Sequence, residues 1–346
     1  GVMHRALRGR EDMLRRTAEL CRGAGMKVIG YYSLVYNNRE FERHPEWRLR
    51  HLDGTDSRSD GSRYGCLCPN NEEYRAFVRA QLAEICGYFP FDGLFLDMTF
   101  WPMVCYCGSC RARWAREVGG AMPDAVDWAD PKWLLFDLKR REWLGEFARM
   151  ATGAVKSLRP EATVEHQYST MMFYWRFGVD GNIAEASDYC GGDLYGGLAE
   201  QSLACKLYAA RTKNPPFEYM TTRAPGLGDH TALKSEALLA RTLALTYMHG
   251  GAPLIIDAID PAGTLDDSAY EAVGAAFERA EKVAGHCKDA RYLQDVVLHF
   301  DLTRKYDPGA GPEGVLSAER KGSVPALGAL MGAARDLTLA VFVEGL

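Results

Sequence analysis

The sequence lacks a long apolar run, an excess of positive charge and any low-complexity segment. A membrane-spanning helix needs about 20 consecutive apolar residues, so none is predicted here. The 41 Lys and Arg residues are outnumbered by 46 Asp and Glu residues, which gives a formal net charge of −5. Proteins that bind nucleic acid or anionic membranes usually carry clustered positive charge. We therefore expect neither nucleic acid nor a membrane as a partner, and we expect the protein to be cytoplasmic.

The ten cysteines lack the spacing of a small disulfide scaffold, and a chain of 346 residues is large enough not to need one. Cys105, Cys107 and Cys110 form a C-x-C-x-x-C cluster that can place three sulfurs around one ion. Tetrahedral zinc needs a fourth nitrogen or sulfur ligand, for which Cys68 is the candidate and Cys66 the substitute. Four thiolates would make the zinc structural. Free thiols and an iron–sulfur cluster are the alternatives.

Short apolar segments alternate with helical segments along the chain, which predicts a parallel α/β sheet. We expect strands at 26–33, 94–98, 163–168, 187–193, 216–221 and 252–257, and helices at 2–22, 72–88, 132–158, 199–212, 233–249 and 268–283. Each strand tends to finish in polar residues. That pattern is typical of a (β/α)₈ TIM barrel, whose active site lies at the carboxyl ends of the strands. An open doubly wound sheet would concentrate function at one switch point instead.

The number of strands before residue 289 and the order of predicted strands and helices after it predict the domain organisation. A closed barrel needs eight strands and six are found, so we interpret residues 1–288 as a catalytic barrel whose first two strands lie upstream of Gly1. Strands at 295–300 and 337–343, with a helix at 324–334, indicate that a second, flavodoxin-like α/β domain begins at 289 and is cut off at Leu346. The polar stretch 37–63 suits a loop at a functional face.

Two segments carry a resemblance to a known family. Cys68-Pro69-Asn70-Asn71-Glu72-Glu73-Tyr74-Arg75, followed by an apolar strand and the C-x-C-x-x-C cluster, resembles the zinc-binding segments of family 42 β-galactosidases. The resemblance implies a structural zinc held by Cys68, Cys105, Cys107 and Cys110. Cys66 has no counterpart in that pattern.

Other landmarks resemble the family 29 and family 151 α-L-fucosidases, and most closely the family called hypothetical glycosyl hydrolase 6. They are Tyr31-Tyr32-Ser33, the His44-Pro45-Glu46-Trp47 segment and the F-D-G-L-F-L-D run at 91–97. The resemblance implies a barrel followed by a domain of the β-galactosidase-trimerisation type. A homotrimer of the full-length protein is implied in the same way.

Asp97 is the first candidate for a catalytic carboxylate. Glycosidic cleavage usually needs two carboxyl groups that flank the scissile bond. Asp97 ends an apolar strand, where a carboxylate is costly unless it is paired or has a function. The family 29 pattern implies that this strand-end Asp is the nucleophile, whereas the family 42 pattern places an acid/base Glu there. We favour the nucleophile, and the alternative is a salt-bridged residue at the barrel rim.

The partner carboxylate is expected to be Glu218, at the end of the strand predicted for 216–221, with Glu165 as the alternative. A rim residue that binds substrate is an equally good interpretation of Glu218. Substrate contacts are expected from residues in or after the predicted strands, namely Tyr32, His166, Asp193, Trp101 and Tyr195. His166 suits either a hydroxyl-binding group or a structural histidine. Trp101 and Tyr195 suit either the apolar face of a sugar or ordinary packing.

The sequence therefore predicts a retaining glycoside hydrolase that acts on a terminal α-L-fucoside or β-galactoside. Two other functions remain open. A non-catalytic carbohydrate-binding relative would keep the aromatic residues and lack a correctly spaced acid pair. A metalloenzyme that uses the cysteine-bound metal directly would need an open coordination position, which a fourth thiolate would remove.

Overall fold

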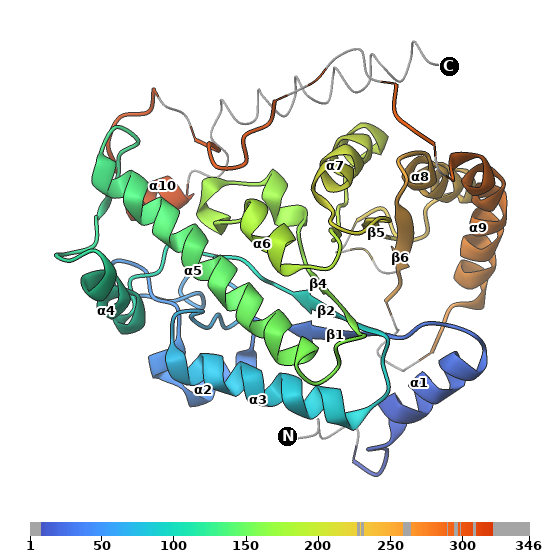
Figure 1. Cartoon of the computed structure of the whole chain (residues 1–346), viewed down its shortest axis with the longest axis horizontal. Helices are drawn as coiled ribbons and strands as arrows, with labels where there is room; N and C mark the ends of the chain where they lie inside the picture. The colour runs from blue at the N-terminus through green and yellow to red at the C-terminus, as the bar shows by residue number, and fades with distance from the viewer. Residues whose placement is uncertain are drawn as a thin grey trace. The chain divides into compact units, whose positions relative to one another are not determined.

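A computed structural model of the chain describes residues 8–226, 229, 232–258, 264–288, 290–293, 297, 299–306 and 309–320. They belong to two compact units. Figure 1 labels the helices and strands. The first unit runs to Asp188 and resumes at Leu302, and the second unit begins at Tyr189 and ends at Asp301. The expected helix at 324–334, the strand at 337–343 and half of the strand at 295–300 lie outside the described residues, and positions 297, 299 and 300 are not in a strand. The second domain predicted for 289–346 therefore stays a prediction.

The first unit is built on a parallel sheet with the strand order β1-β2-β4. These strands are β1 (Ile29–Ser33), β2 (Gly93–Asp97) and β4 (Thr163–His166). The helices of this unit are α1 (Met13–Gly23), α2 (Asn38–Arg43), α3 (Glu72–Tyr88), α4 (Gly108–Glu117), α5 (Pro131–Lys156), α6 (Gly181–Ala186) and α10 (Val315–Arg320). Short 3₁₀ turns occur at Pro45–Trp47, Ser169–Met172 and Trp175–Phe177. A small antiparallel pair joins β3 (Ala125–Val126) to β7 (Glu313–Gly314).

Helix starts in this unit follow from local sequence. Asn71 precedes α3, and its side chain accepts a hydrogen bond from the backbone N–H of Tyr74. Asp130 caps α5 in the same way, and Pro131 occupies the first helical position, where the missing N–H costs nothing. These caps explain why the predicted starts at 72 and 132 agree with the structure to within one residue.

The two faces of the β1-β2-β4 sheet differ, because side chains alternate along a strand. Leu94, Leu96, Val164 and His166 lie on one face, and the His166 ring bonds Thr152 of α5 on that side. Tyr31, Phe95 and Glu165 are paired in register across the other face, which also carries Asp97. Tyr31 is 61% exposed there. The second face is therefore the one that could line the interior of a barrel.

The second unit contains a parallel pair, β5 (Glu218–Thr222) and β6 (Ala252–Ile256). Its helices are α7 (Leu198–Arg211), α8 (Glu236–Met248) and α9 (Asp267–Cys287). Helices α8 and α9 form a small apolar core, against which Ile255 of β6 packs. The pairing places Ile255 opposite Thr221, so the neighbouring positions Met220 and Thr222 belong to the other face of the pair.

The prediction of a strand at 187–193 is wrong. No strand is present there among the described residues, although Asp193 forms an isolated parallel bridge with Met220. Backbone bonds from Glu218 to Cys190 and from Met220 to Gly192 give partial strand character. Gly192 has a φ of 140°, a conformation that breaks the regular ladder at this point.

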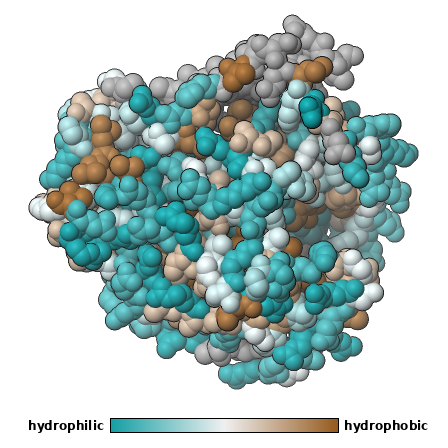
Figure 2. Space-filling model, viewed as in Figure 1, coloured by the Kyte–Doolittle hydropathy of each residue, from teal (hydrophilic) through white to brown (hydrophobic). Residues whose placement is uncertain are grey.

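The parallel α/β arrangement is confirmed, and five of the six expected strands are present within a few residues of their predicted bounds. The described strands form separate sheets and do not close into a barrel. No helix in the described part of the chain is long and apolar enough to cross a bilayer. Figure 2 shows a mostly hydrophilic surface on the face in view, with apolar side chains in small separate groups.

Candidate functional site

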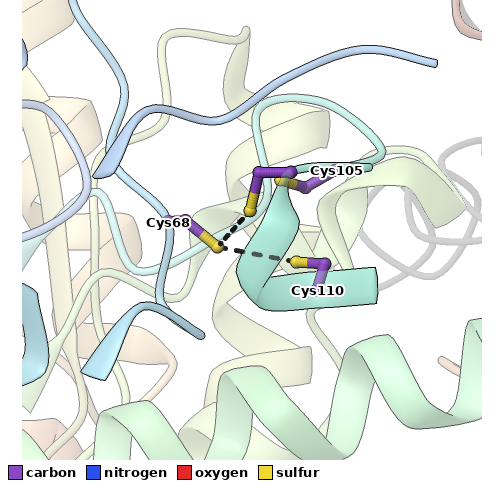
Figure 3. A group of neighbouring side chains, drawn as sticks. Cys68, Cys105 and Cys110 are labelled. Carbon is purple, nitrogen blue, oxygen red and sulfur yellow. Dashed lines mark hydrogen bonds between the residues drawn. The ribbon is translucent and has the colours of Figure 1, made fainter. Parts of the chain in front are cut away.

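Four cysteine sulfurs meet between the starts of α3 and α4 (Figure 3). Cys68, Cys105, Cys107 and Cys110 are all buried, and their Sγ atoms lie within 4.8 Å of one another. The Sγ of Cys68 is 3.5 Å from those of both Cys107 and Cys110. This is much longer than a disulfide bond of about 2.05 Å. Cys66 lies outside the group, so the fourth sulfur is that of Cys68.

This arrangement fits a tetrahedral metal ion. Zinc with Zn–S bonds of about 2.3 Å would place its sulfurs about 3.8 Å apart. Burial raises the pKa of the Cys68 and Cys110 thiols. A bound cation would offset this cost, because it stabilises the thiolate form. The four residues could therefore hold one metal ion in a closed site.

Neighbouring polar groups support the sulfurs. The backbone N–H of Asn70 donates to Cys68 Sγ at 3.4 Å, and its Nδ2 donates to Cys110 Sγ at 3.3 Å. Arg113 of α4 donates in turn to Asn70 Oδ1 at 3.0 Å and pairs with Glu117 at 2.7 Å. Hydrogen bonds of this kind, made by neighbouring residues to ligand side chains, fix the orientation of metal ligands. The cluster thus joins α3, α4 and the loop that follows β2.

Asp97 is held at the carboxyl end of β2. It is 8% exposed. Its Oδ2 accepts a hydrogen bond from the Tyr31 hydroxyl at 2.5 Å, and its Oδ1 accepts one from the Met98 N–H at 2.8 Å. Met98 has a φ of 59°, which is unusual for a residue other than glycine. Such backbone strain is concentrated at functional sites, because the surrounding structure must be arranged to hold it.

A cavity of about 650 Å³ lies within the first unit. Its walls come from the segments that follow β1, β2 and β4, together with α10. The lining side chains are Tyr36, His51, Ser57, Ser59, Asp60, Ser62, Cys66, Pro102, Met103, Tyr174, Arg176, Leu316 and Glu319. The cavity is therefore at the carboxyl end of the sheet, where barrel enzymes bind substrate.

Asp97 does not line this cavity, but it lies close to one of the lining residues. Burial raises the pKa of Tyr36, and the charge of Asp97 adds to the effect, which indicates that the carboxylate is close to this lining residue. The Asp97 carbonyl also accepts a hydrogen bond from Leu34, and Ser33 Oγ donates to the carbonyl of Tyr36. The loop after β1 is thus attached to the end of β2 at Asp97.

The two expected partner carboxylates occupy different positions. Glu165 lies in β4 on the same sheet face as Asp97, with 1% of its surface exposed. Glu218 belongs to the second unit and begins β5, so the prediction that it ends its strand is wrong. Pro215 and Pro216 explain the difference, since proline has no N–H for the ladder and the strand starts only after them. Burial raises the pKa of Glu218 to about 7.

The expected substrate-binding residues of the β1-β2-β4 sheet lie mostly on its helix-covered side. Tyr32 alternates with Tyr31, so it belongs to the face opposite Asp97. The two ring nitrogens of His166 bond the hydroxyls of Thr99 and Thr152 at 2.9 and 2.8 Å. Burial lowers the pKa of His166 to about 3. This geometry favours the structural role that the sequence left open for His166.

Trp101 is 1% exposed, and its Nε1 donates to the carbonyl of Arg140 at 2.9 Å. Packing is therefore the better interpretation of this residue. In the second unit, the Tyr195 hydroxyl donates to Asp193 Oδ2 at 2.6 Å, and both side chains are partly exposed. Asp193 and Tyr195 can therefore contact a ligand together, which stays a prediction.

The residues that line the cavity carry no sequence motif that marks them as a group. The Tyr31-Tyr32-Ser33 segment predicts a substrate contact at Tyr32, whereas Tyr31 is the tyrosine that contacts Asp97. Only the register between β1 and β2 shows that Tyr31, and not Tyr32, lies on the same sheet face as Asp97. No motif marks His51, Asp60 or Glu319. The first two belong to the polar stretch 37–63, which contributes five side chains to the cavity lining, and its role as a functional face stays a prediction.

Residues 2–98 match the sequence model of the family described as hypothetical glycosyl hydrolase 6. No curated protein sequence is significantly similar to the chain. The match includes β1 and β2 and ends one residue beyond Asp97. The resemblance inferred from the Tyr31-Tyr32-Ser33 segment and the 91–97 run is therefore confirmed over this part of the chain.

Three solved structures with a similar fold are glycosidases. The α-L-fucosidase isoenzyme 2 from Paenibacillus thiaminolyticus has 22% identity and a TM-score of 0.67, covering 82% of this chain and 42% of that chain. The β-galactosidase from Bacillus circulans sp. alkalophilus has 12% identity and a TM-score of 0.64, covering 86% and 53%. The β-galactosidase from Halorubrum lacusprofundi has 14% identity and a TM-score of 0.60, covering 78% and 50%.

The chain spans about half the length of these three proteins. At such low identities the likeness concerns the fold alone. It supports a TIM-barrel-like α/β fold, although the described strands form no closed barrel. The chain thus shares the fold of glycosidases, and its residues 2–98 match the hypothetical glycosyl hydrolase 6 family.

Proposed function

We propose that this chain is the barrel portion of a glycoside hydrolase, with Asp97 as its nucleophile and the cavity of the first unit as its sugar site. The single observation that carries the proposal is the position of Asp97. It ends β2, is oriented by Tyr31 and the strained Met98, and acts electrostatically on Tyr36, which lines a cavity built from loops that follow the strands. The match of residues 2–98 to a glycosyl hydrolase family supports it.

The chemistry of the cavity suits a carbohydrate. Sugars present many hydroxyls that both donate and accept hydrogen bonds, and apolar C–H faces between them. The lining combines hydroxyl groups (Ser57, Tyr36), charged groups (Asp60, Arg176) and apolar side chains such as Met103. A volume of about 650 Å³ lies within the range of roughly 300–1,000 Å³ typical of small-molecule sites.

In the proposed mechanism, an Asp97 carboxylate oxygen attacks the anomeric carbon as the bond to the leaving oxygen breaks. A second carboxyl group donates its proton to that oxygen, and later removes a proton from the water that hydrolyses the glycosyl ester. The hydrogen bonds from Tyr31 and Met98 keep Asp97 aimed during both steps. The anomeric configuration is retained, because two inversions occur at the same carbon.

Glu165 and Glu218 remain the candidates for the second carboxyl group. Glu165 shares the sheet face of Asp97, which favours it by position. Glu218 has the property expected of an acid, since burial raises its pKa to about 7. An acid/base variant keeps activity on dinitrophenyl glycosides, whose leaving group needs no proton, and loses activity on alkyl glycosides. Comparing Glu165→Gln with Glu218→Gln on both substrates would identify the acid.

The four-cysteine cluster would hold a structural zinc in this proposal. Zinc would supply four bonds that tie the loop after β2 to the starts of α3 and α4. Pro102 and Met103 of that loop line the cavity, so the cluster would give rigid support to the proposed sugar site. Direct metal catalysis is not favoured, because four thiolates leave no open position.

The substrate class is proposed from the fold neighbours, an α-L-fucosidase and two β-galactosidases. The test is the hydrolysis of a panel of 4-nitrophenyl glycosides by the full-length protein and by its Asp97→Ala variant, with zinc assayed in both. We expect α-L-fucoside or β-galactoside cleavage to collapse in the variant while zinc is retained. Sodium azide should restore turnover of an activated substrate, because it replaces the missing nucleophile.

A non-catalytic carbohydrate-binding protein is the second candidate. The observation that favours it is the position of Glu218, which begins β5, together with the near-complete burial of Glu165. A folded, zinc-loaded protein that binds a monosaccharide and cleaves no glycoside of the panel would support this candidate and would refute hydrolysis of these sugars.

A further inference from the structure

A row of three charged side chains crosses one wall of the cavity. His51 lies between two carboxylates, with its Nε2 at 2.7 Å from Asp60 Oδ2 and its Nδ1 at 3.2 Å from Glu319 Oε2. The histidine is 7% exposed and Glu319 is 6% exposed, whereas the side chain of Asp60 is 44% exposed. The row therefore runs from a buried carboxylate to one that reaches the open cavity.

The buried end of the row comes from a distant part of the sequence. Glu319 belongs to α10, and its Oε1 accepts a hydrogen bond from the backbone N–H of Val104 in the loop after β2. Its carbonyl oxygen accepts one from Arg176 in the segment after β4 at 2.9 Å. Glu319 thus contacts the segments that follow all three strands of the sheet, since His51 follows β1.

The segment around α10 is attached to the first unit at several further points. The ring of Tyr306 stacks on Trp128 with 3.9 Å between their centroids. The Nζ of Lys305 is buried and donates to the carbonyl of Val179 at 2.6 Å. Strand β7 pairs with β3, and Val315 is fully buried. The segment 302–320, described except at 307 and 308, is therefore part of the cavity's structure.

We propose that the segment 302–320 completes the sugar-binding cavity, and that Glu319 is a positioning residue which acts through His51 to aim the Asp60 carboxylate at a sugar hydroxyl. The inference rests on the proposed function, because it takes the cavity to be the carbohydrate site. A carboxylate fixed in this way accepts a hydroxyl hydrogen bond without losing side-chain entropy on binding. The ligand class is a neutral monosaccharide unit.

The electrostatics agree with this geometry. Although burial opposes the charge on His51, its hydrogen bonds to Glu319 and Asp60 raise its pKa to about 9. The histidine is then a cation at neutral pH and donates to both carboxylates at once. A neutral imidazole could donate to only one of them.

The test uses the full-length protein and calorimetric titration with L-fucose and D-galactose. Asp60→Asn and Glu319→Gln should each weaken binding of the preferred sugar by about tenfold, the usual effect of losing a hydrogen bond to a charged group. The double variant should bind no more weakly than either single variant, because both changes break one row. Glu313→Gln, on the same segment and outside the cavity lining, should bind normally.

Glu319→Gln could perturb folding, since Glu319 also accepts from Val104. His51→Gln therefore provides a second break in the row that leaves this acceptor in place, and it should weaken binding in a protein that circular dichroism shows to be folded at the assay temperature. Normal sugar affinity in a folded Glu319→Gln or His51→Gln variant would overturn the inference. Additive losses in the double variant would also overturn it, since Asp60 and Glu319 would then act separately.

Failure of the proposed function gives a different result. If the protein binds a monosaccharide but cleaves no glycoside, the hydrolase proposal is refuted. The sugar affinities of the Asp60, His51 and Glu319 variants then still test the inference. A protein that binds neither sugar overturns the inference. If glycosides are cleaved, the row variants should raise KM and leave kcat within about twofold. A selective fall in kcat would refute a positioning role in sugar binding.

Discussion

The Asp97 side chain has two hydrogen bonds that bear directly on its proposed role. The Tyr31 hydroxyl and the Met98 N–H each bond one carboxylate oxygen, so the plane of the carboxylate is fixed relative to β2. Tyr31 comes from the neighbouring strand and lies on the same sheet face. Orientation of a nucleophile affects the chemical step more than it affects binding of the ground state.

Tyr31→Phe should therefore lower kcat by about tenfold and leave KM nearly unchanged, because it removes one bond to a charged group. Steady-state kinetics of the full-length protein on its best aryl glycoside provide the measurement. Tyr32→Phe is the matched control, since the adjacent tyrosine lies on the helix-covered face. Equal effects of the two variants would show that Tyr31 acts only through general stability.

Glu218 allows a test that does not depend on activity. Burial raises its pKa from 4.5 to about 7, so the folded state favours the protonated form. Below pH 4.5 the carboxyl group is protonated in the folded and unfolded states, so its burial does not lower the unfolding free energy. As the pH rises through 7 the group must be charged, and the unfolding free energy falls. Glu218→Gln should thus be more stable than the parent at pH 8, by an amount on the order of 3 kcal/mol, and equally stable at pH 4. Urea unfolding at the two pH values would measure the difference, and a constant difference would contradict the burial argument.

At the scale of elements, the cysteine cluster connects parts of the chain that the sheet does not connect. Cys68 precedes α3, whereas Cys105, Cys107 and Cys110 lie in the loop after β2 and the first turn of α4. A bound metal would therefore contribute to the stability of both helix starts. Three of its cysteines were predicted from their spacing, and the resemblance to family 42 β-galactosidases implied Cys68 as the fourth; the structure brings these four residues together.

Cys110→Ser should abolish stoichiometric zinc and lower the melting temperature by roughly 10 °C, since a structural metal contributes its binding free energy to folding. Metal analysis and calorimetry on the same samples would measure both effects. Cys66→Ser is the control, because Cys66 is buried near the cluster but is not among its four sulfurs. Zinc loss in the Cys66 variant, with zinc retained in the Cys110 variant, would show that the ligand set is wrong.

The sequence was most informative where a signal is local. The apolar run 94–96 followed by Asp97 predicted the strand and its polar end, and Asn71 and Asp130 account for the helix starts. The error at Glu218 was also local, since two prolines before it delay the strand. The prediction of Tyr32 in place of Tyr31 depends on contacts between strands. Alternation shows that the two face opposite ways, but only the register between strands shows which of them meets Asp97.

At the scale of the whole chain, the row Asp60–His51–Glu319 could not have been predicted from the sequence. His51 and Glu319 are separated by 268 positions, and no motif marks either residue. Residues 302–320, which include Glu319, belong to the first unit, and no local signal in this segment indicates its contacts with the loops after β1 and β2. Contacts of this kind arise from the path of the chain, which residue spacing does not encode.

The same row should make the stability of the first unit depend on pH in a defined direction. The contacts with Glu319 and Asp60 raise the pKa of His51 from 6.5 to about 9, despite an opposing effect of burial. Its contribution to stability is thus fully present below pH 6.5 and is lost as the pH rises through 9. The difference in unfolding free energy between the parent and His51→Gln should shrink from pH 6 to pH 9.5. Urea unfolding followed by tryptophan fluorescence would measure it, with His44→Gln as a control outside the row. A difference that grows with pH would mean that His51 is neutral in the folded protein, and the row would then lack the cation that holds its two carboxylates together.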